Sequence, residues 1–216
     1  MQIINFYGNP NIGLFFYSTN KFTIVPKTTT EQTVKIVEDE LKTTVIKLDV
    51  FNSSVNAIFL SGNDELLLIP RKVSKDVISE LEKLKMKLEV INTDFNALGN
   101  NIVIHKKKAL VNPNFEEAAV KQLEKLGFEV LKCKIAGVET VGANLVIFKN
   151  KGLINEKVKD DEFNLISEFF DIEIERGTVN NYSSIVKAGF CKNDAGILVS
   201  SEMNGSEIMA LEALMK

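Results

Sequence analysis

Short apolar runs, polar turns and amphipathic segments follow one another in the same order five times along this chain. Each copy contains a short motif that closes a predicted strand and ends in Pro or a polar residue: Ile24-Val25-Pro26, Leu68-Ile69-Pro70, Val111-Asn112-Pro113, Ile154-Asn155-Glu156 and Val199-Ser200-Ser201. The last positions of consecutive motifs are 44, 43, 43 and 45 residues apart. Such even spacing predicts a repeat architecture in which each copy is one supersecondary unit. A unit of this size buries too little apolar surface to stand alone, so it must pack against its neighbours.

Each unit begins with a short apolar run that we predict to be a strand covered on both faces, because these runs are rich in β-branched and aromatic residues. The five runs are Gly13–Tyr17, Ala57–Leu60, Ile102–Ile104, Asn144–Phe148 and Ala188–Cys191. Polar turns follow at Thr19-Asn20, Asn63-Asp64, Lys106-Lys107, Asn150–Gly152 and Asn193-Asp194. Asn, Asp and Gly tolerate the positive φ of short hairpins, so each run is predicted to pair with the strand after it.

A helix with one apolar stripe follows the hairpin in every unit. The stripes are Val34/Val37/Leu41, Val77/Leu81/Leu84, Val120/Leu123/Leu126, Leu165/Ile166/Phe169 and Ile208/Leu211/Leu214. We predict capping boxes at Thr28–Glu31, Asn114–Glu117 and Asn204–Glu207, and a lone N-cap at Ser74. A third strand closes the unit at Val45–Phe51, Leu88–Ile91, Val130–Ile135 and Asp171–Glu175. A single stripe per helix predicts that the helices lie outside a strand-lined core.

The fifth unit has no third strand of its own, because the sequence stops at Lys216 directly after its helix. Met1–Phe6 is a strand-like run with no helix before it. We therefore predict that Met1–Phe6 completes the fifth unit and closes the five units into a ring, which also removes exposed strand edges. The predicted fold is a single α/β domain, residues 1–216, with five-fold pseudosymmetry. Its units span roughly residues 11–54, 55–98, 99–141, 142–186 and 187–216 plus 1–10.

Composition agrees with one cytoplasmic domain. The chain is 45% hydrophobic and has four prolines and no Ser/Gly-rich linker. It has no apolar stretch near the ~20 residues that span a bilayer, and its N-terminus lacks the features of a signal peptide. The two cysteines, Cys133 and Cys191, lie in different strand-like runs, so we expect no disulfide and a reducing cytosol. The net charge of −3 does not favour a protein whose affinity comes mainly from neutralising phosphates.

The residues needed for catalysis are scarce. His105 is the only histidine and ends an apolar strand beside three lysines, where a rim position is the simpler interpretation. Cys191 is either a nucleophile of an enzyme that also uses His and a carboxylate, or a small apolar strand residue, and the second interpretation is favoured. No metal-binding or nucleotide-binding motif is present, so we expect no cofactor and no metal. Lys83, Lys85 and Lys87, or Lys106–Lys108, are candidate RNA phosphate contacts or simply solvated charges.

After each third strand the chain crosses back to begin the next unit. These crossings are Tyr7–Gly13, Asn52–Asn56, Phe95–Asn100, Ala136–Gly142 and Gly177–Ser184. Equivalent positions of a ring lie on the same side, so we expect all five crossings to meet on one face. Their Gly and Asn residues allow close backbone approach and offer amide donors and acceptors, which suits a docking surface. The alternative is that these residues serve only the turns, since Asn occurs 21 times in the chain.

These crossings carry a family likeness. Asn11–Phe15, Leu98-Gly99-Asn100, Leu110–Pro113 and the run from Gly177-Thr178-Val179-Asn180 to Ala188-Gly189 resemble archaeal and eukaryotic translation initiation factor 6, in order and spacing along essentially the whole chain. The resemblance implies a five-fold α/β propeller of the pentein type. It also implies an anti-association factor that binds the large ribosomal subunit at its inter-subunit face, next to universal large-subunit ribosomal protein fourteen and the sarcin–ricin loop, and so blocks the small subunit.

The ribosome-binding residues predicted in this way are Asn11, Gly13, Asn100, Gly142, Gly177, Thr178, Val179 and Asn180. No bond is made or broken in this mechanism, so we expect no enzymatic activity. We also expect the protein to be a monomer. The chain lacks the C-terminal tail of eukaryotic members, which favours an archaeal source, and its second crossing has Ser54–Ala57 where a glycine is usual. The alternatives are an amidine-modifying enzyme of the same architecture, with Cys191 and His105 at the ring centre, and a scaffold for a partner other than the ribosome.

Overall fold

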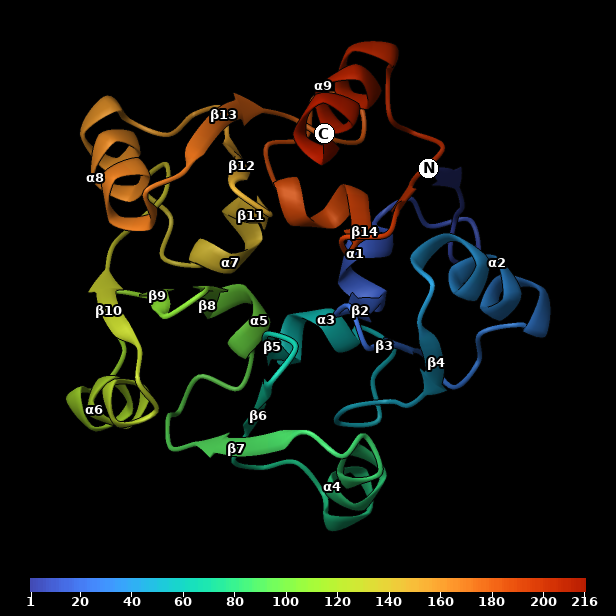
Figure 1. Cartoon of the computed structure of the whole chain (residues 1–216), viewed down its shortest axis with the longest axis horizontal. Coiled ribbons are helices and arrows are strands. Elements are labelled where there is room, and N and C mark those ends of the chain that lie inside the picture. Colours follow the sequence, from blue (N-terminus) through green and yellow to red (C-terminus); the bar gives the residue numbers. More distant parts are fainter.

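The computed structural model describes residues 1–216 as five three-stranded sheets arranged around a central axis (Figure 1). In each sheet the inner and middle strands are antiparallel, and the middle and outer strands are parallel. In the order inner, middle and outer, the strands are β2 (Tyr17–Ser18), β3 (Phe22–Val25) and β4 (Thr44–Lys47); β5 (Ser61–Gly62), β6 (Leu66–Pro70) and β7 (Lys87–Ile91); β8 (Ile102–His105), β9 (Lys108–Val111) and β10 (Glu129–Lys132); β11 (Leu145–Phe148), β12 (Lys151–Asn155) and β13 (Glu173–Gly177); and β14 (Phe190–Lys192), β15 (Ile197–Val199) and β1 (Gln2–Ile3). The predicted five-fold pseudosymmetric α/β architecture is confirmed.

The N-terminal strand closes the ring as predicted. In β1, Gln2 lies opposite Leu198 and Ile3 opposite Val199 of β15, in a parallel register. The pairing continues past the strand, since the Ile4 N–H donates to the Val199 carbonyl at 2.8 Å. The first and last segments of the chain therefore form one sheet.

In the first four units an outer helix links the middle strand to the outer strand, which is the connection that a parallel pair requires, whereas the fifth outer helix follows β15 and is not joined to β1. These helices are α2 (Glu31–Leu41), α4 (Lys75–Glu82), α6 (Glu117–Lys125), α8 (Asp160–Phe170) and α9 (Gly205–Met215), and Figure 1 shows them on the periphery. The N-caps predicted at Ser74 and Asn204 are confirmed. Those predicted at Thr28 and Asn114 are wrong. No helix of the structure combines the length and the apolar character that crossing a bilayer would require.

The two mistaken caps have local causes. Thr30, two residues after Thr28, accepts the hydrogen bond from the Thr33 N–H and is the actual N-cap of α2. In α6 the N-cap is Glu116, and its side chain makes no capping bond because it turns to the loop at residues 93–94 instead.

Five helical turns surround the axis, and they correct part of the strand prediction. They are α1 (Ile12–Phe15), α3 (Asn56–Phe59), α5 (Leu98–Asn101), α7 (Val141–Asn144) and the 3-10 turn η1 (Val186–Gly189). In the predicted run at 13–17 only Tyr17 belongs to a strand, the run at 57–60 contains no strand residue, and Ala188-Gly189 of the fifth run lie in η1. An apolar run of four or five residues has the same pattern in either structure, and here tight packing around the axis selects the helix. Each turn contacts the next one, and η1 contacts α1, so the inner ring is closed (Figure 1).

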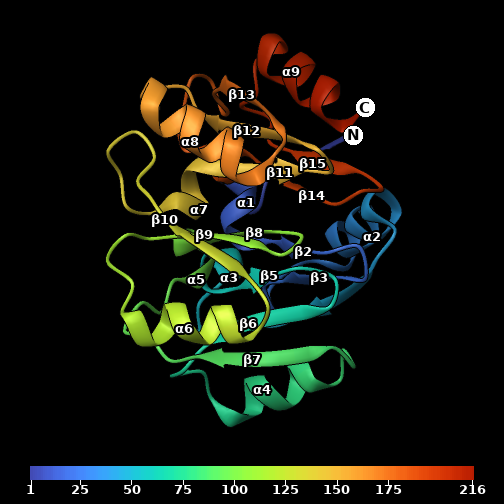
Figure 2. The ribbon, with the colours of Figure 1, turned by 60° about the vertical axis from the view of Figure 1, so that its left-hand side comes forward.

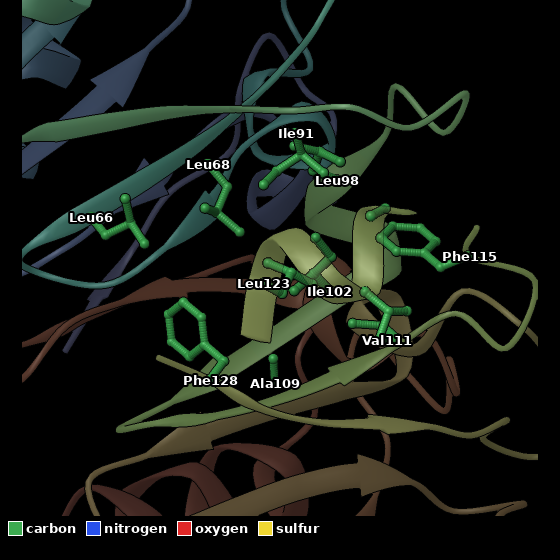
Figure 3. Close-up of a cluster of buried hydrophobic side chains, with 12 residues drawn as sticks. Leu66, Leu68, Ile91, Leu98, Ile102, Ala109, Val111, Phe115, Leu123 and Phe128 are labelled. Atoms are coloured by element: carbon green, nitrogen blue, oxygen red, sulfur yellow. The ribbon is translucent and has the colours of Figure 1, made fainter. Parts of the chain in front are cut away.

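The hydrophobic core is divided into five clusters that lie between neighbouring units. In the cluster of Figure 3, Leu66 and Leu68 of β6 pack against Ala109 and Val111 of β9 and Leu123 of α6. The residues that fill one cluster thus come from two consecutive units. No unit has a core of its own, which is the physical reason for the ring.

The ring has two different sides. Every outer strand ends on the side where the five helical turns begin, so the segments 4–11, 48–55, 92–97, 133–140 and 178–185 all cross there; we call this side the crossing face. The five turns between inner and middle strands lie on the opposite side, the hairpin face. Figure 2 shows the crossings after β7 and β10 on the left and the β14–β15 hairpin on the right.

Candidate functional site

Four of the five crossings begin with the same tight turn. Two consecutive residues have positive φ, or three in the fifth crossing where Tyr182 (73°) follows, and an isolated bridge joins the positions on either side. The turn residues are Tyr7-Gly8, Phe51-Asn52, Ala136-Gly137 and Asn180-Asn181, with φ between 49° and 78°. This turn also shortens the predicted third strands, because Val50 and Ile135 belong to it rather than to β4 and β10. A left-handed conformation costs a residue other than glycine ~1–2 kcal/mol, so the surroundings must hold these turns in place.

A buried carboxylate holds the fifth crossing. Glu207, in the first turn of α9, is only 4% exposed. It accepts hydrogen bonds from Thr178 Oγ1 at 2.7 Å and from the backbone N–H groups of Tyr182 (2.8 Å) and Asn181 (3.1 Å). Burial alone would raise the pKa of Glu207, but hydrogen bonds from Tyr182, Thr178, Asn204 and Asn181 lower it. The loop is therefore tied to an ionised group at a helix N-terminus.

Two other crossings are held in the same way from the start of their own outer helix. Glu116 accepts from Thr93 Oγ1 at 2.7 Å and from the Asp94 N–H at 3.0 Å. Its pKa is lowered by these bonds, although burial alone would raise it. Glu162 of α8 accepts from the Ala136 and Gly137 N–H groups at 2.7 and 3.3 Å. Three of the five crossings therefore have fixed backbones.

The crossing face exposes four large apolar or aromatic side chains, beside the charged Asp94, Lys134 and Glu139 of the third and fourth crossings. Tyr7 and Tyr182 are each 70% exposed, Ile185 50% and Val138 44%. They belong to the fourth, fifth and first crossings, which are consecutive around the ring (Figure 1). Exposed large apolar residues gathered on one surface mark an interaction site more often than single ones do.

Two predicted site residues, Gly13 and Gly142, lie at the centre of the ring and are buried. A Cβ on Gly13 would lie 1.8 Å from the Lys187 carbonyl oxygen, and one on Gly142 would lie 2.3 Å from the Gly99 carbonyl oxygen. Gly99 occupies the same place in α5, with 2.0 Å to the Ala57 carbonyl oxygen. These glycines let adjacent helical turns touch, so they shape the crossing face from beneath.

The predicted residues of the fifth crossing have different exposures. Val179 is fully buried, and Thr178 is occupied by its bond to Glu207. A Cβ on Gly177 would lie 2.7 Å from Leu153 Cδ1. Asn180 is half-buried, and its Nδ2 donates to Asn11 Oδ1 at 3.1 Å and to the Pro10 carbonyl at 3.3 Å. The structure thus brings Asn180 and Asn11 together and joins the fifth crossing to the first.

Asn100 stands apart from that pair. It lies in α5 and is half-buried, and its side-chain Oδ1 has no hydrogen-bond partner although the atom is shielded from solvent. A shielded acceptor without a donor is uncommon and costly, but Thr29 Oγ1, His105 Nε2, Ser167 Oγ and Asn204 Nδ2 share this property, so it does not by itself mark a point of contact.

Several other asparagines serve the fold itself. Asn112 Nδ2 donates to Asn101 Oδ1 at 2.7 Å, and Asn155 Nδ2 donates to Asn144 Oδ1 at the same distance. These two buried pairs occupy equivalent places in the third and fourth units. Much of the abundance of asparagine therefore belongs to the repeat and not to the docking surface.

The sequence analysis did not predict that Glu116, Glu162 and Glu207 accept hydrogen bonds from the crossings, nor that Tyr7 and Tyr182 are exposed. The signal for Glu207 was present, since it was predicted as the glutamate of a capping box, and the structure shows it accepting from the Asn204 N–H at 3.0 Å as well. Nothing in the sequence distinguishes Tyr7 or Tyr182 from a core aromatic. Their exposure follows from the turn geometry alone.

The candidate catalytic pair does not fit nucleophilic chemistry. Burial raises the pKa of the Cys191 thiol to about 12, and nearby Lys192 and Lys187 offset only part of this effect. A nucleophilic cysteine needs the opposite, a thiolate at neutral pH. His105 ends β8 at the hairpin side of the ring, as predicted, and burial together with neighbouring lysines lowers its pKa.

The model of the eIF-6 family matches residues 1–214. Translation initiation factor 6 of Saccharolobus islandicus is 33% identical over 216 residues, covering 98% of this chain and 97% of the relative. Translation initiation factor 6 of Pyrobaculum aerophilum is 32% identical over 213 residues, with the same two coverages.

Solved structures of similar shape are enzymes. An amidinotransferase from Microseira wollei, SxtG, superposes with a TM-score of 0.56 at 13% identity over 83% of this chain and 64% of its own. DDAH from Pseudomonas aeruginosa gives 0.52 at 10% identity over 82% and 71%. At such identities the likeness shows the fold alone, which is the pentein fold. The match over nearly the full length and the relatives above 30% identity show that the chain belongs to the eIF-6 family of translation initiation factors.

Proposed function

We propose that this factor docks on the large ribosomal subunit through its crossing face and thereby prevents premature association with the small subunit. The observation that carries the proposal is the crossing face itself, where carboxylates hold three loops and four large apolar or aromatic side chains face solvent. Fixed loops lose little conformational entropy on docking, so more of the contact energy is available as affinity.

A protein component of the subunit suits this face better than bare RNA. The crossings that expose Tyr7, Tyr182 and Ile185 contain no charged residue between positions 4 and 11 or 178 and 185. Neutralising RNA phosphates takes Lys or Arg, whereas aromatic side chains are enriched in protein interfaces. The large-subunit protein fourteen implied by the family resemblance is the partner we propose, with the sarcin–ricin loop beside it.

The area required is small compared with the molecule. A specific interface buries at least ~1,000 Å² in total, which is roughly half from each partner. The accessible surface of the chain is 9952 Å², so one side of the ring is several times larger than the area that this factor would bury. A bound ring then excludes the small subunit by its bulk, without any covalent step.

Co-sedimentation with purified archaeal large subunits tests the proposal. The double variant Tyr182→Ala/Ile185→Glu removes one exposed ring and adds a charge to the face without touching the core. We expect its binding to fall by at least ~10-fold, the effect of losing about 1.4 kcal/mol.

The matched control is Met209→Glu on α9, because Met209 is 72% exposed but lies on an outer helix (Figure 1). It should bind like the wild type. Full binding by the double variant would remove the crossing face from the proposal. Val179→Glu is unsuitable as a probe, since Val179 is fully buried and its replacement would test folding.

The two alternatives predict other outcomes. A scaffold for another partner would stay at the top of a sucrose gradient even with an excess of large subunits. An enzyme of the amidine-modifying kind would need rapid alkylation of Cys191 by iodoacetamide at neutral pH. The raised pKa of this buried thiol leads us to expect slow labelling instead.

A further inference from the structure

A cavity of about 180 Å³ lies on the axis of the ring. Its floor is the inner ring of helical turns, where Gly13, Gly99 and Gly142 leave no room for a side chain. Its walls include Leu60, which follows α3, and the inner-strand residues Ile102 and Leu145. It opens toward the hairpin face through a wider mouth of about 450 Å³, and the two spaces share Ser18, Gly62, Ile147 and Lys192.

Two lysines reach into this cavity. Lys187, from η1, donates from Nζ to the carbonyl oxygens of Gly99 at 2.6 Å and Ala57 at 2.8 Å. An ammonium group has three N–H donors, so one remains free to bind a ligand. Lys192, from β14, lines both the cavity and its mouth, and its Nζ lies 4.9 Å from the centre of the Phe148 ring.

No carboxylate lines the cavity itself, and Asp194 and Asp64 at its mouth are the acidic groups that act on Lys192. Neither Lys187 nor Lys192 takes part in a salt bridge. The mouth adds His105, Lys106 and Lys149. Its two carboxylates, Asp64 and Asp194, accept hydrogen bonds from Asn20 Nδ2 at 2.7 and 3.0 Å.

Burial lowers the pKa of Lys187 to about 7 and also lowers the pKa of Lys192, against the weaker opposing effect of Asp194. Both shifts mean that the folded protein resists charging these amines when the cavity holds no anion. An anion placed between them would stabilise the ammonium forms and would itself be held by charge-assisted hydrogen bonds.

We propose that the axial cavity is a binding site for a small phosphate-class dianion, either inorganic phosphate or a phosphate monoester, held between Lys187 and Lys192. A dianion balances the two ammonium groups. The apolar walls leave little else for a ligand to bond, while the polar mouth gives room for the organic part of an ester. The site opens on the hairpin face, so it stands independently of ribosome docking through the crossing face.

The test is calorimetric titration of the full chain, in a chloride buffer near pH 7, with inorganic phosphate and separately with glycerol 3-phosphate. We expect one saturable site for at least one probe, with binding at least ~10-fold weaker in Lys192→Met. The control Lys72→Met removes an exposed lysine from the turn before α4 and should bind like the wild type. Tighter binding of the ester than of phosphate would place its organic part in the mouth.

Lys187→Met is the sharper variant, but it also removes two hydrogen bonds from the floor. Its fold is therefore checked by circular dichroism, and phosphate-dependent thermal stabilisation is recorded in parallel. The wild type should melt at higher temperature with phosphate than with chloride at equal ionic strength, and Lys187→Met and Lys192→Met should not. Absence of saturable binding of both probes to the wild type, or unchanged binding in Lys192→Met, would overturn the proposal.

Discussion

Glu207 is a charged side chain that the fold can bury because four donors surround its carboxylate. We predict that Glu207→Gln destabilises the protein by about 1–3 kcal/mol, since a neutral amide cannot accept all of these bonds. Urea unfolding gives the magnitude, and amide hydrogen exchange should show faster exchange across residues 178–183. Glu202→Gln, at an exposed position of the preceding loop, is the control and should leave both measurements unchanged.

The same carboxylate makes stability depend on acid. Its pKa is lowered in the folded state, so the stabilisation is complete above the unfolded pKa of about 4.3 and is lost as the pH falls through the lower folded value. Glu116 acts in the same direction. The loss of free energy of unfolding between pH 5 and pH 3 should therefore be smaller in Glu207→Gln than in the wild type. An equal loss of free energy of unfolding in both proteins over this pH range would show that the ionised Glu207 does not stabilise the fold.

Lys187 should produce the opposite kind of dependence, at higher pH. Burial lowers its pKa to about 7, whereas an unfolded lysine titrates near 10.4. Above pH 7 the unfolded chain holds a proton here that the folded chain lacks, so the free energy of unfolding rises with pH, by at most ~1.4 kcal/mol per unit. Cys191 has the opposite effect on the free energy of unfolding above about pH 8.5. There the unfolded thiol loses its proton, whereas the buried thiol of the folded chain keeps it. Urea midpoints at pH 7.0, 7.75 and 8.5 should rise in the wild type and rise less in Lys187→Met. An equal rise of the urea midpoint with pH in both proteins would exclude Lys187 as the group responsible.

The inner helical turns depend on close backbone contact, and this gives a matched pair of glycine variants. Gly142→Ala would place a methyl group 2.3 Å from the Gly99 carbonyl oxygen, so α5 and α7 would have to move apart. We expect a cost of at least about 1–3 kcal/mol. Gly205→Ala, in the first turn of α9 with no atom within 4 Å of the new Cβ, should be neutral or slightly stabilising. Thermal unfolding compares the two, and equal effects would contradict the packing argument.

These turns also show where sequence information ends. Outer helices were predictable because a period of 3.6 extends over 8 to 11 residues in each. Hairpins were predictable because their polar turn residues have a local conformational role. The runs at 13–17 and 57–60 carry no such period, and only contacts with residues far away, such as Lys187 against Gly13, make them helical.

The docking surface was predictable to a similar extent. The repeat placed all five crossings on one side, and the sequence of the fifth crossing singled out Asn180, which the structure joins to Asn11. Burial could not be foreseen for Val179, whose neighbours in sequence are polar, nor could exposure for Tyr182. The axial position of Lys187 has no local signal either, because a lysine in an apolar run has the same pattern whether it faces solvent or a cavity.

Closure by the N-terminal strand should make the five units unfold as one. Ile4 and Phe6 follow β1 and share a cluster with Phe15 and Leu41 of the first unit and Leu198 of the fifth, so the seam has the same kind of core as every other junction. An open array would unfold from its end units, whereas a closed ring has no end from which to begin.

Phe6→Ala tests this cooperativity, because Phe6 is 7% exposed at the seam. The cavity left behind should cost about 3–5 kcal/mol. In a closed ring this loss lowers the free energy of unfolding of the whole molecule. Amides of β12, in the fourth unit and outside the seam, should therefore exchange faster by global opening, just as those of β3 in the first unit do. Leu165→Ala, at a residue 44% exposed on α8, should change stability by less than about 0.5 kcal/mol. Loss of protection confined to the first and fifth units would mean that the ring opens at its seam and that closure adds little to the stability of the other units.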